Sequence, residues 1–266
     1  MVNDDLEERR SKSLRAYAIE QALNRLETER PNFVPEPIVA AICAYEEEGN
    51  IAGVLEKMPT SVNGEPYTTL VVVDGGDDHT AEIARSFPGV IVIEFPVNLG
   101  HGVALQVAYR YCVRHNVKAV VTLDADGQND PAEIPQIVAP LLADQTDFVL
   151  GSRVLGVDKT SDKIRKSGVR VFSLIMNRMT GSNLTDTSTG YRALRVTMLA
   201  DVVDRLTQQQ YQTSELLITS LKRGWRVSEV PTVWHPRVSG ETKKGKTWIY
   251  GFRYARVVFG TWWRER

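Results

Sequence analysis

Two aspartates separated by one small residue, Asp124-Ala125-Asp126, follow one of the most apolar stretches of the chain, Ala119 to Leu123, and precede Gly127-Gln128. Carboxylates at this spacing, just beyond a buried strand, can offer oxygen ligands to a hard divalent cation. Such a cation could bridge to a diphosphate. The triplet alone is a weak signal, and the alternative is a polar turn that leads into a helix.

The polar-turn interpretation does account for the next segment. Asp130 suits the N-cap of a helix, Pro131 its first position and Glu133 its third. We therefore assign these three residues to the start of a helix and keep Asp124 and Asp126 as candidate metal ligands.

A second acidic segment, Asp74-Gly75-Gly76-Asp77-Asp78-His79-Thr80, follows the apolar run Leu70 to Val73. Its glycines let the backbone turn sharply and approach a ligand, and its carboxylates can accept hydrogen bonds from a base or a ribose. A turn with a helix N-cap would explain Asp78 or Thr80. It would not explain the crowding of aspartates, whose repulsion a cation or hydrogen-bond donors would relieve.

Two further loops bear on the class of ligand. Tyr45-Glu46-Glu47-Glu48 occupies the position where a dinucleotide-binding chain carries its glycine-rich turn, and acidic groups there would repel a pyrophosphate. This argues against a nicotinamide dehydrogenase. The glycines of Asn98-Leu99-Gly100-His101-Gly102-Val103-Ala104 could let helix-start amides face a ligand, although an ordinary turn explains them equally well.

The elements that must position these residues alternate along the chain. Short apolar runs with the character of buried strands occur at Ile38 to Ala44, Leu70 to Val73, Val90 to Ile93, Ala119 to Leu123 and Phe148 to Leu150. Helical patterns lie between them, at Ile51 to Met58, Ala81 to Ser86, Val103 to His115 and Ile134 to Ala143. The alternation predicts an α/β fold with a mainly parallel sheet covered by helices on both faces, and a ligand at the carboxyl ends of the strands.

The first 35 residues are predicted to be a helical extension. Charged residues dominate residues 1–30, and one face repeats apolar side chains at helical spacing, namely Ala16, Ile19, Leu23 and Leu26. The prolines from Pro31 to Pro37 end this pattern. We expect the main domain over residues 36–247 and an aromatic and basic tail over residues 248–266.

Composition excludes some classes of function. The chain has 32 basic and 33 acidic residues, so nothing in its overall charge favours nucleic acid as a partner. Cys43 and Cys112 lie in or near apolar stretches with no signal-peptide pattern before them, which fits a reducing cytoplasm. No apolar run approaches the ~20 residues that cross a bilayer. Peripheral attachment to the inner face of a membrane stays open.

Nine segments form an ordered series within residues 38–247. They are Ala44-Tyr45-Glu46-Glu47, Asp74 to Thr80, Asn98 to Gly102, Asp124 to Gln128, Gly151-Ser152-Arg153, Asp186-Thr187-Ser188-Thr189-Gly190-Tyr191-Arg192, Glu215, Glu229-Val230-Pro231 and Arg237 to Lys243. The series resembles the family 2 inverting glycosyltransferases, most of all their dolichol-phosphate mannose synthase-like and polyprenyl-phosphate glycosyltransferase branch. The length of the ordered set makes the resemblance specific.

The resemblance implies a GT-A fold and a set of roles. The residues expected near the nucleotide sugar are Ala44, Tyr45, Glu47, Asp74, Asp78, Asp124, Ala125 and Arg153. The expected ligands of Mg²⁺ or Mn²⁺ are Asp124, Asp126 and Gln128. The expected catalytic residues are Asp186, Arg237 and Lys243, with the basic side chains gathering phosphates and Asp186 beside the acceptor.

The chain departs from the family pattern at four positions. Cys43 stands where proline is usual, Glu46 where asparagine is usual, Val73 where a first aspartate is common and Gly76 where serine is common. These departures concern the identity of the base and the sugar more than the chemistry.

The resemblance implies transfer from a nucleotide diphosphate sugar, of the GDP-mannose or UDP-glucose type, to a polyprenyl or dolichyl phosphate. A phosphate acceptor is ionised near neutral pH and needs no strong base, whereas a hydroxyl acceptor would need one, for which Asp186 is the candidate. Two alternatives stay open: the same chemistry on a soluble acceptor, and a protein that binds a nucleotide sugar without turning it over.

Two segments have the composition of membrane-contacting surfaces. Residues 159–178 alternate basic and apolar side chains, and residues 248–263 combine aromatic residues with arginines. The first pattern is typical of an amphipathic helix on an anionic bilayer, and equally of a surface helix whose apolar side packs on the core. The second suits the bilayer interface, and equally a partner surface or the back of the domain.

Overall fold

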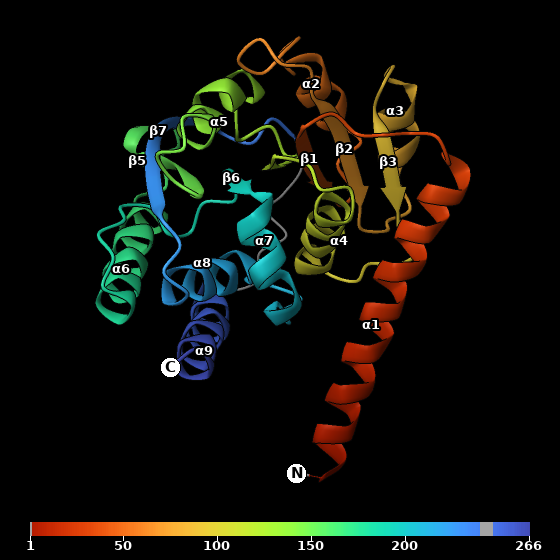
Figure 1. The fold of residues 1–266 in the computed structure, drawn as a ribbon. Coiled ribbons are helices and arrows are strands. Elements are labelled where there is room, and N and C mark those ends of the chain that lie inside the picture. The colour runs from red at the N-terminus through yellow and green to blue at the C-terminus, as the bar shows by residue number, and fades with distance from the viewer. Residues whose placement is uncertain (1, 240–246) are drawn as a thin grey trace.

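The computed structural model describes residues 2–239 and 247–266. In these residues seven strands form one sheet, in the order β3-β2-β1-β4-β6-β5-β7 (Figure 1). The strands are β1 Ile38–Ala44, β2 Thr68–Val73, β3 Ile91–Glu94, β4 Ala119–Asp124, β5 Phe148–Asp158, β6 Arg192–Arg195 and β7 Val227–Trp234.

The predicted α/β fold with a mainly parallel sheet is confirmed. Strands β1 to β4 pair in parallel, and β5 pairs in parallel with β7. The exception is β6, which runs antiparallel to both β4 and β5. We predicted neither β6 nor β7. Strand β6 has only four residues, of which two are the arginines Arg192 and Arg195. Strand β7 contains Glu229 and Pro231, and most of its residues are only partly buried.

Helices cover both faces of the sheet. The helices are α1 Val2–Glu29, α2 Ile51–Glu56, α3 Thr80–Ser86, α4 His101–Arg114, α5 Ile134–Leu142, α6 Lys163–Thr180, α7 Val196–Val202, α8 Gln212–Lys222 and α9 Thr247–Arg264, with short 3-10 turns η1 Pro131–Glu133 and η2 Val203–Arg205. One apolar cluster joins the sheet to α2, α3 and α5, and another joins it to α1, α4, α7 and α8.

Strand β1 shows why both faces must be covered. Val39, Ala41 and Cys43 belong to one apolar cluster, whereas Ile42 and Ala44 belong to the other. All seven residues of the strand are buried. A strand buried on both sides reads as a continuous apolar run, which is why the sequence located it well.

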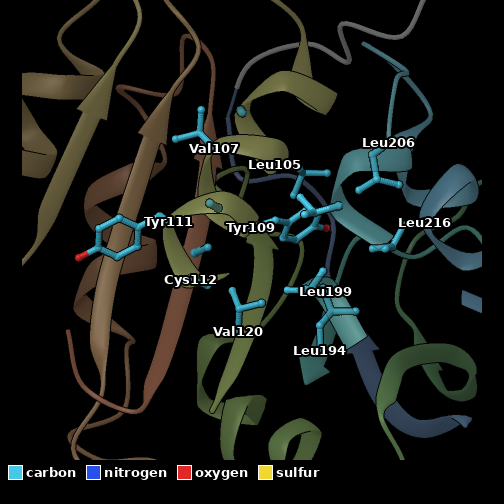
Figure 2. Packing of buried hydrophobic residues seen from close by; sticks show 14 of the residues in the cluster. Leu105, Val107, Tyr109, Tyr111, Cys112, Val120, Leu194, Leu199, Leu206 and Leu216 are labelled. Atoms are coloured by element: carbon cyan, nitrogen blue, oxygen red, sulfur yellow. The ribbon is translucent and has the colours of Figure 1, made fainter. Parts of the chain in front are cut away.

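The larger of the two clusters is centred on α4. Figure 2 shows Tyr109 of this helix among Leu105, Leu199 and Leu216, while Cys112 and Tyr111 lie farther along the helix. Burying one such side chain stabilises the fold by ~1.5–3 kcal/mol. The cluster therefore fixes α4, whose first residue lies at the carboxyl edge of the sheet.

The register of the strands brings the acidic segments to one edge. Cys43 is paired with Asp124, and Ala44 is paired with Val73, the residue before Asp74. The loops after β1, β2 and β4 therefore begin side by side, as the parallel arrangement predicts.

Helix α1 packs only through its second half. Ile19, Leu23 and Leu26 are buried, as predicted, but Ala16 is exposed, so the predicted apolar face begins one turn too early. Figure 1 shows why: the helix follows the edge of the domain beside α4 and β3, and its N-terminal half extends beyond the other elements. Arg114 of α4 donates hydrogen bonds to Glu20 and Glu27 and so holds the packed half.

The segment expected to be a tail contains α9, which packs on α6 and α8. Tyr254 and Val258 are buried there, and the indole Nε1 of Trp262 donates a hydrogen bond of 2.7 Å to the carbonyl of Met179. Across the described stretches of the chain, no helix is both long enough and apolar enough to span a membrane.

Candidate active site

Asp74, at the end of β2, holds the loop before α4. Its carboxylate accepts hydrogen bonds from the amides of Leu99, at 2.7 Å, and Gly100, at 2.9 Å. Burial raises the pKa of Asp74, while these two amides act in the opposite direction. Of the two interpretations of this loop, the ordinary turn is the one that fits these two amides, because they already donate to the protein itself.

The amide of Gly102 is likewise taken, because it donates to the carbonyl of Gln209 at 2.7 Å. A Cβ at Gly102 would lie 2.3 Å from the carbonyl oxygen of Gln208. This glycine is thus required by a close approach between two segments of the chain rather than by a ligand.

Asp78 ties the loop after β2 to the loop after β1. Its carboxylate accepts from the amide of Glu48 at 3.0 Å and from the amide of Thr80 at 3.1 Å. The amide of Glu47 donates in turn to Thr80 Oγ1 at 2.8 Å. Gly75, with φ of +71°, allows the turn, because a Cβ there would lie 2.5 Å from the backbone of Val97. Asp78 therefore links the loops after β1 and β2.

Asp124 and Asp126 lie at the end of β4 as candidate metal ligands. Asp124 is partly exposed, whereas Asp126 is buried and accepts the amide of Gln128 at 3.0 Å. Burial, followed by the negative charge of Asp124, raises the pKa of Asp126 to about 6. A bound cation would relieve this burial cost and repulsion, so the pair fits a divalent ion.

These carboxylates need help from other ligands. Within residues 2–239 and 247–266, no three His, Cys, Asp or Glu side chains converge closely enough to hold a metal ion. A divalent ion here would take its remaining oxygens from a donor diphosphate and from water. The side chain of Gln128, the third expected ligand, donates through Nε2 to the carbonyl of His235 at 3.2 Å.

Arg237 occupies the space between two acidic loops. Its guanidinium pairs with Glu47, and its Nη1 lies 3.4 Å from Asp126 Oδ2. Glu47 also accepts from Asn50 Nδ2 at 2.6 Å. Arg237 thus supplies a positive charge beside the candidate metal ligand, as an internal counter-ion.

Arg153 and Asp186 form a second, deeper pair. Arg153 Nε and Nη2 donate to the two oxygens of Asp186 at 2.6 and 3.0 Å, and the Asp186 side chain is fully buried. The guanidinium carbon of Arg153 lies 4.5 Å from the ring centroid of Trp234. Two parallel hydrogen bonds and a stacked ring hold this arginine in one orientation.

The loop that carries Asp186 is fixed by two residues to which we assigned no role. Glu229 accepts the amides of Thr185, at 2.7 Å, and Asp186, at 2.8 Å. Arg192 is fully buried and donates to the carbonyls of Thr187 and Thr189. Burial lowers the pKa of Arg192 to about 10. The sequence signal for both residues was a charged side chain inside an otherwise apolar or small-residue stretch.

Two other residues at the site were missed. Trp234 ends β7, and its stacking on Arg153 is not visible in the sequence spacing. His101, the first residue of α4, has its Nε2 3.8 Å from Asp124 Oδ1. We gave no histidine a catalytic role, and a single histidine after a glycine carries no recognisable metal-ligand spacing.

The structure places the remaining predicted site residues as follows. Ala44 is buried at the end of β1, and Ala125 is buried just after β4. The carbonyl of Ala44 accepts a hydrogen bond from the amide of Asp74, and the amide of Ala125 donates to the carbonyl of Cys43. Tyr45 is partly exposed at the mouth of the same loops. Lys243, the third expected catalytic residue, lies outside the described residues.

A comparison with protein-family models gives the decisive observation. The model described as Glycosyl transferase family 2 matches residues 39–203, which span β1 to η2 and include Asp74, Asp124, Asp126, Arg153 and Asp186. The chain belongs to glycosyltransferase family 2. The family predicted from the sequence is confirmed.

Relatives of this glycosyltransferase carry names of polyprenyl-phosphate enzymes. Dolichyl-phosphate hexose transferase of Haloferax volcanii is 31% identical over 208 residues, which cover 78% of this chain and 86% of that protein. Undecaprenyl-phosphate mannosyltransferase of Micrococcus luteus is 28% identical over 215 residues, which cover 77% and 86%. The resemblance to this branch is thereby confirmed.

Solved structures confirm the GT-A fold of the glycosyltransferase. Glucosyl-3-phosphoglycerate synthase of Mycobacterium tuberculosis, in complex with Mn²⁺ and UDP-glucose, aligns with a TM-score of 0.64 over 91% of this chain and 82% of that one. Its sequence identity is 19%, so the likeness concerns the fold alone.

Proposed function

We propose that this glycosyltransferase moves a sugar, with inversion, from a nucleotide diphosphate sugar to a polyprenyl or dolichyl phosphate. The observation that carries the proposal is the meeting of Asp124 and Asp126 with Arg237 at the carboxyl ends of β1 and β4. Exchangeable positive charge beside a carboxylate pair suits a leaving diphosphate, on which negative charge builds as the sugar bond breaks.

Asp124 and Asp126 would hold Mg²⁺ or Mn²⁺. The ion would stabilise the charge of the departing diphosphate as a Lewis acid. Gln128 would contribute its Oε1, since its Nε2 already donates to the carbonyl of His235. His101, next to Asp124, would orient that carboxylate, since second-sphere contacts fix the direction of metal ligands.

The donor would lie over the loops after β1 and β2. Tyr45, with an aromatic ring at the mouth of the site, would contact the base, and Glu47 would face the sugar nucleotide once Arg237 moves. Asp74 and Asp78 would contribute through the loops that they fix, because their carboxylates already accept backbone amides. Arg237 and Lys243 would then gather phosphate oxygens.

Asp186 bears on the nature of the acceptor. Its oxygens accept from Arg153 and from Ser188, and the side chain has no solvent exposure. We propose that Asp186 positions Arg153 for an acceptor phosphate rather than removing a proton. An acceptor phosphate is already ionised and needs no general base, so this arrangement favours a phosphate over a hydroxyl acceptor.

Attachment to a membrane surface would bring such a lipid to the site. Helix α6 exposes Val171, Leu174 and Ile175, and the basic residues Arg170 and Arg178 lie on the same helix. An apolar and basic surface of this kind suits the interface of an anionic bilayer. We propose peripheral attachment on the cytoplasmic side.

The proposal is tested by a transfer assay with purified protein and Mn²⁺. UDP- and GDP-sugars are each supplied with a polyprenyl phosphate in detergent, and product formation is followed by mass spectrometry. We expect one donor family to support transfer and Asp126→Asn to lower kcat by ~10²-fold or more, because a developing charge loses its stabilisation. Thermal unfolding serves as the control for folding of the variant.

Three outcomes would overturn parts of the proposal. Normal turnover by Asp126→Asn would remove the metal assignment. Transfer to small phosphorylated acceptors but never to a lipid phosphate would replace the acceptor class. Donor binding without transfer or hydrolysis to any acceptor would leave a nucleotide-sugar-binding protein.

A further inference from the structure

A basic cavity lies at the C-terminal ends of α8 and α9, and it shares no lining residue with the candidate active site. Its volume is about 350 Å³. It is lined by Arg205, Lys222, Arg223, Arg264, Glu265 and Arg266. Five cationic side chains from η2, α8 and α9 and the segments that follow α8 and α9 therefore face one space, with a single carboxylate among them.

Three of these cations are compensated by carboxylates. Arg223 pairs with Asp201, Arg264 pairs with the fully buried Glu215 at 2.9 Å, and Glu265 lies 2.9 Å from Arg264 and 3.5 Å from Arg205. With Asp201 and Glu215 included, cationic side chains still outnumber carboxylates by two. The cavity thus has the charge of an anion site.

The uncompensated cations are Lys222 and Arg266. Among the described residues, neither has a carboxylate within ion-pair distance, and both lie over the ring of Trp262, at 5.5 and 4.1 Å from its centroid. Trp262 is itself fixed by its hydrogen bond to Met179. A cation stacked on a fixed ring keeps its donors available for a second partner, such as a phosphate oxygen.

The surface beside the cavity is aromatic. Phe259 and Trp263 are spaced one helical turn apart on α9 and are 53% and 68% exposed. The guanidinium of Arg266 also lies 4.8 Å from the ring centroid of Trp263. Exposed aromatic rings beside basic side chains suit the headgroup level of a bilayer, where one part of the ring is apolar and the other is wet.

We propose that this cavity binds the phosphate headgroup of an anionic membrane lipid, with Phe259 and Trp263 entering the interface beside it. Lys222 and Arg266 supply the charge, and the stacked Trp262 holds them. The site gives the protein a point of membrane contact in addition to the acceptor and to the surface of α6. The biological role of this site rests on the proposed function, because membrane binding would bring the protein to a lipid acceptor. The observations for the site itself, namely the cavity, its positive charge and the aromatic rings beside it, do not depend on that acceptor.

The test is flotation of the full chain with vesicles. We expect binding to vesicles of phosphatidylcholine mixed with phosphatidylglycerol, and much weaker binding to phosphatidylcholine alone. Replacing both free cations, Lys222→Gln with Arg266→Gln, should lower partitioning by about 30-fold, because each basic residue near an anionic surface contributes about a fivefold factor. A matched control, Lys57→Gln with Lys118→Gln, makes the same change of charge on other elements and should bind normally.

Free phosphate forms a second arm of the experiment. If inorganic phosphate raises the unfolding temperature of the unmodified protein but not of the Lys222→Gln, Arg266→Gln variant, while vesicles do not bind, the lipid assignment is overturned in favour of a soluble phosphate compound. Equal loss of binding in the matched control would also overturn it, since total charge would then explain the effect. Without phosphate, the Lys222→Gln, Arg266→Gln variant should unfold at the same temperature as the unmodified protein. Misfolding is then excluded as the cause of its weaker vesicle binding.

The outcome is separable from that of the transfer assay. Charge-dependent vesicle binding without transfer would leave this site in place and remove the proposed acceptor. If the protein transfers sugar to a lipid phosphate in detergent, and vesicle binding does not change when Lys222 and Arg266 are replaced, the proposed acceptor stands and the headgroup site is overturned.

Discussion

The molecule contains two arginine–aspartate pairs close to the same site, and they are built differently. Arg153 and Asp186 are joined by two short hydrogen bonds, and their side chains are 7% and 0% exposed. Arg237 reaches Asp126 by a single contact of 3.4 Å, and its side chain is 20% exposed. The first pair is enclosed by Trp234 and the Glu229-held loop, whereas the second is bounded by two loops.

The difference separates a fixed arginine from an exchangeable one. Arg153 cannot leave Asp186 without exposing a buried charge, so it offers a permanent cation to whatever lies beside it. We propose that Arg237 gives up its single contact with Asp126 when a metal ion binds there. The proposed transfer from a metal-bound donor would then use both kinds of cation.

Breaking the fixed pair should have the largest effect. Arg153→Met leaves the Asp186 carboxylate buried without its partner, and we expect the free energy of unfolding to fall by ~3–5 kcal/mol. Urea denaturation measures this change.

Arg153→Lys provides the control. It keeps the charge but loses the two parallel hydrogen bonds and the stacking on Trp234, so it should recover only part of the stability. If Arg153→Met unfolds at the same urea concentration as the unmodified protein, the pair is not the fixed element described above.

Breaking the Arg237–Asp126 pair should change metal binding as well as stability. Arg237→Gln removes a positive charge beside Asp126, and we expect affinity for Mn²⁺ in the absence of donor to rise by about tenfold. The free energy of unfolding should fall, because Glu47 and Asp126 lose a shared counter-ion, but by less than for Arg153→Met, since these carboxylates are 9% and 13% exposed whereas Asp186 has no exposure. Titration of Mn²⁺ followed by electron paramagnetic resonance gives the affinity directly.

Arg237→Lys is the matched variant, because it retains the charge and should leave Mn²⁺ affinity near its original value. Transfer should still decrease in Arg237→Gln, since the donor phosphates lose a cation. Weaker Mn²⁺ binding by Arg237→Gln would mean that the arginine supports the metal site rather than competing with the ion.

The sequence predicted the carboxylates that follow strands better than it predicted the arginines that pair with them. Asp124, Asp126, Asp74 and the loop after β1 follow buried strands, and parallel strands bring their ends together whatever the helices do. For the same reason five of the seven strands were located, although β5 continues to Asp158, well beyond its predicted end at Leu150. Strands β6 and β7 were not predicted, because β6 is four residues long with two arginines and β7 is mostly only partly buried, so neither has the apolar signature of a buried strand.

Pairings between distant loops were beyond the sequence. The spacing of residues does not show that Arg153 contacts Asp186 or that Glu229 binds the loop that carries Asp186. It also does not show that Arg237 contacts Glu47. Each depends on where a loop turns back, and each uses residue types that occur equally often as solvated charges. The two interpretations of the amides before α4 could not be separated for the same reason, since their partner Asp74 lies in another loop.

The smallest change in stability is expected at Asp147, which contacts two arginines outside the loops that would hold the donor. Asp147, at the start of β5, accepts from Arg226 Nε at 2.9 Å and from Arg195 Nε at 3.2 Å. The hydrogen bonds from Arg226 lower the pKa of Asp147 below its ordinary value. A depressed carboxylate pKa stabilises the fold above the unfolded-state pKa of about 3.9, and this stability is lost as the pH falls through the lower native value.

The prediction is that Asp147→Asn lowers the unfolding temperature at neutral pH and that the difference from the unmodified protein shrinks below about pH 4. Thermal unfolding over a series of pH values, without metal or donor, measures it. A difference that stays constant down to the lowest pH would mean that Asp147 acts through neutral hydrogen bonds rather than through its charge. The Asp147–Arg226 pair would then differ from both pairs at the site. In Arg153–Asp186 the buried carboxylate requires its cation, and in Arg237–Asp126 we propose that a metal ion replaces the cation.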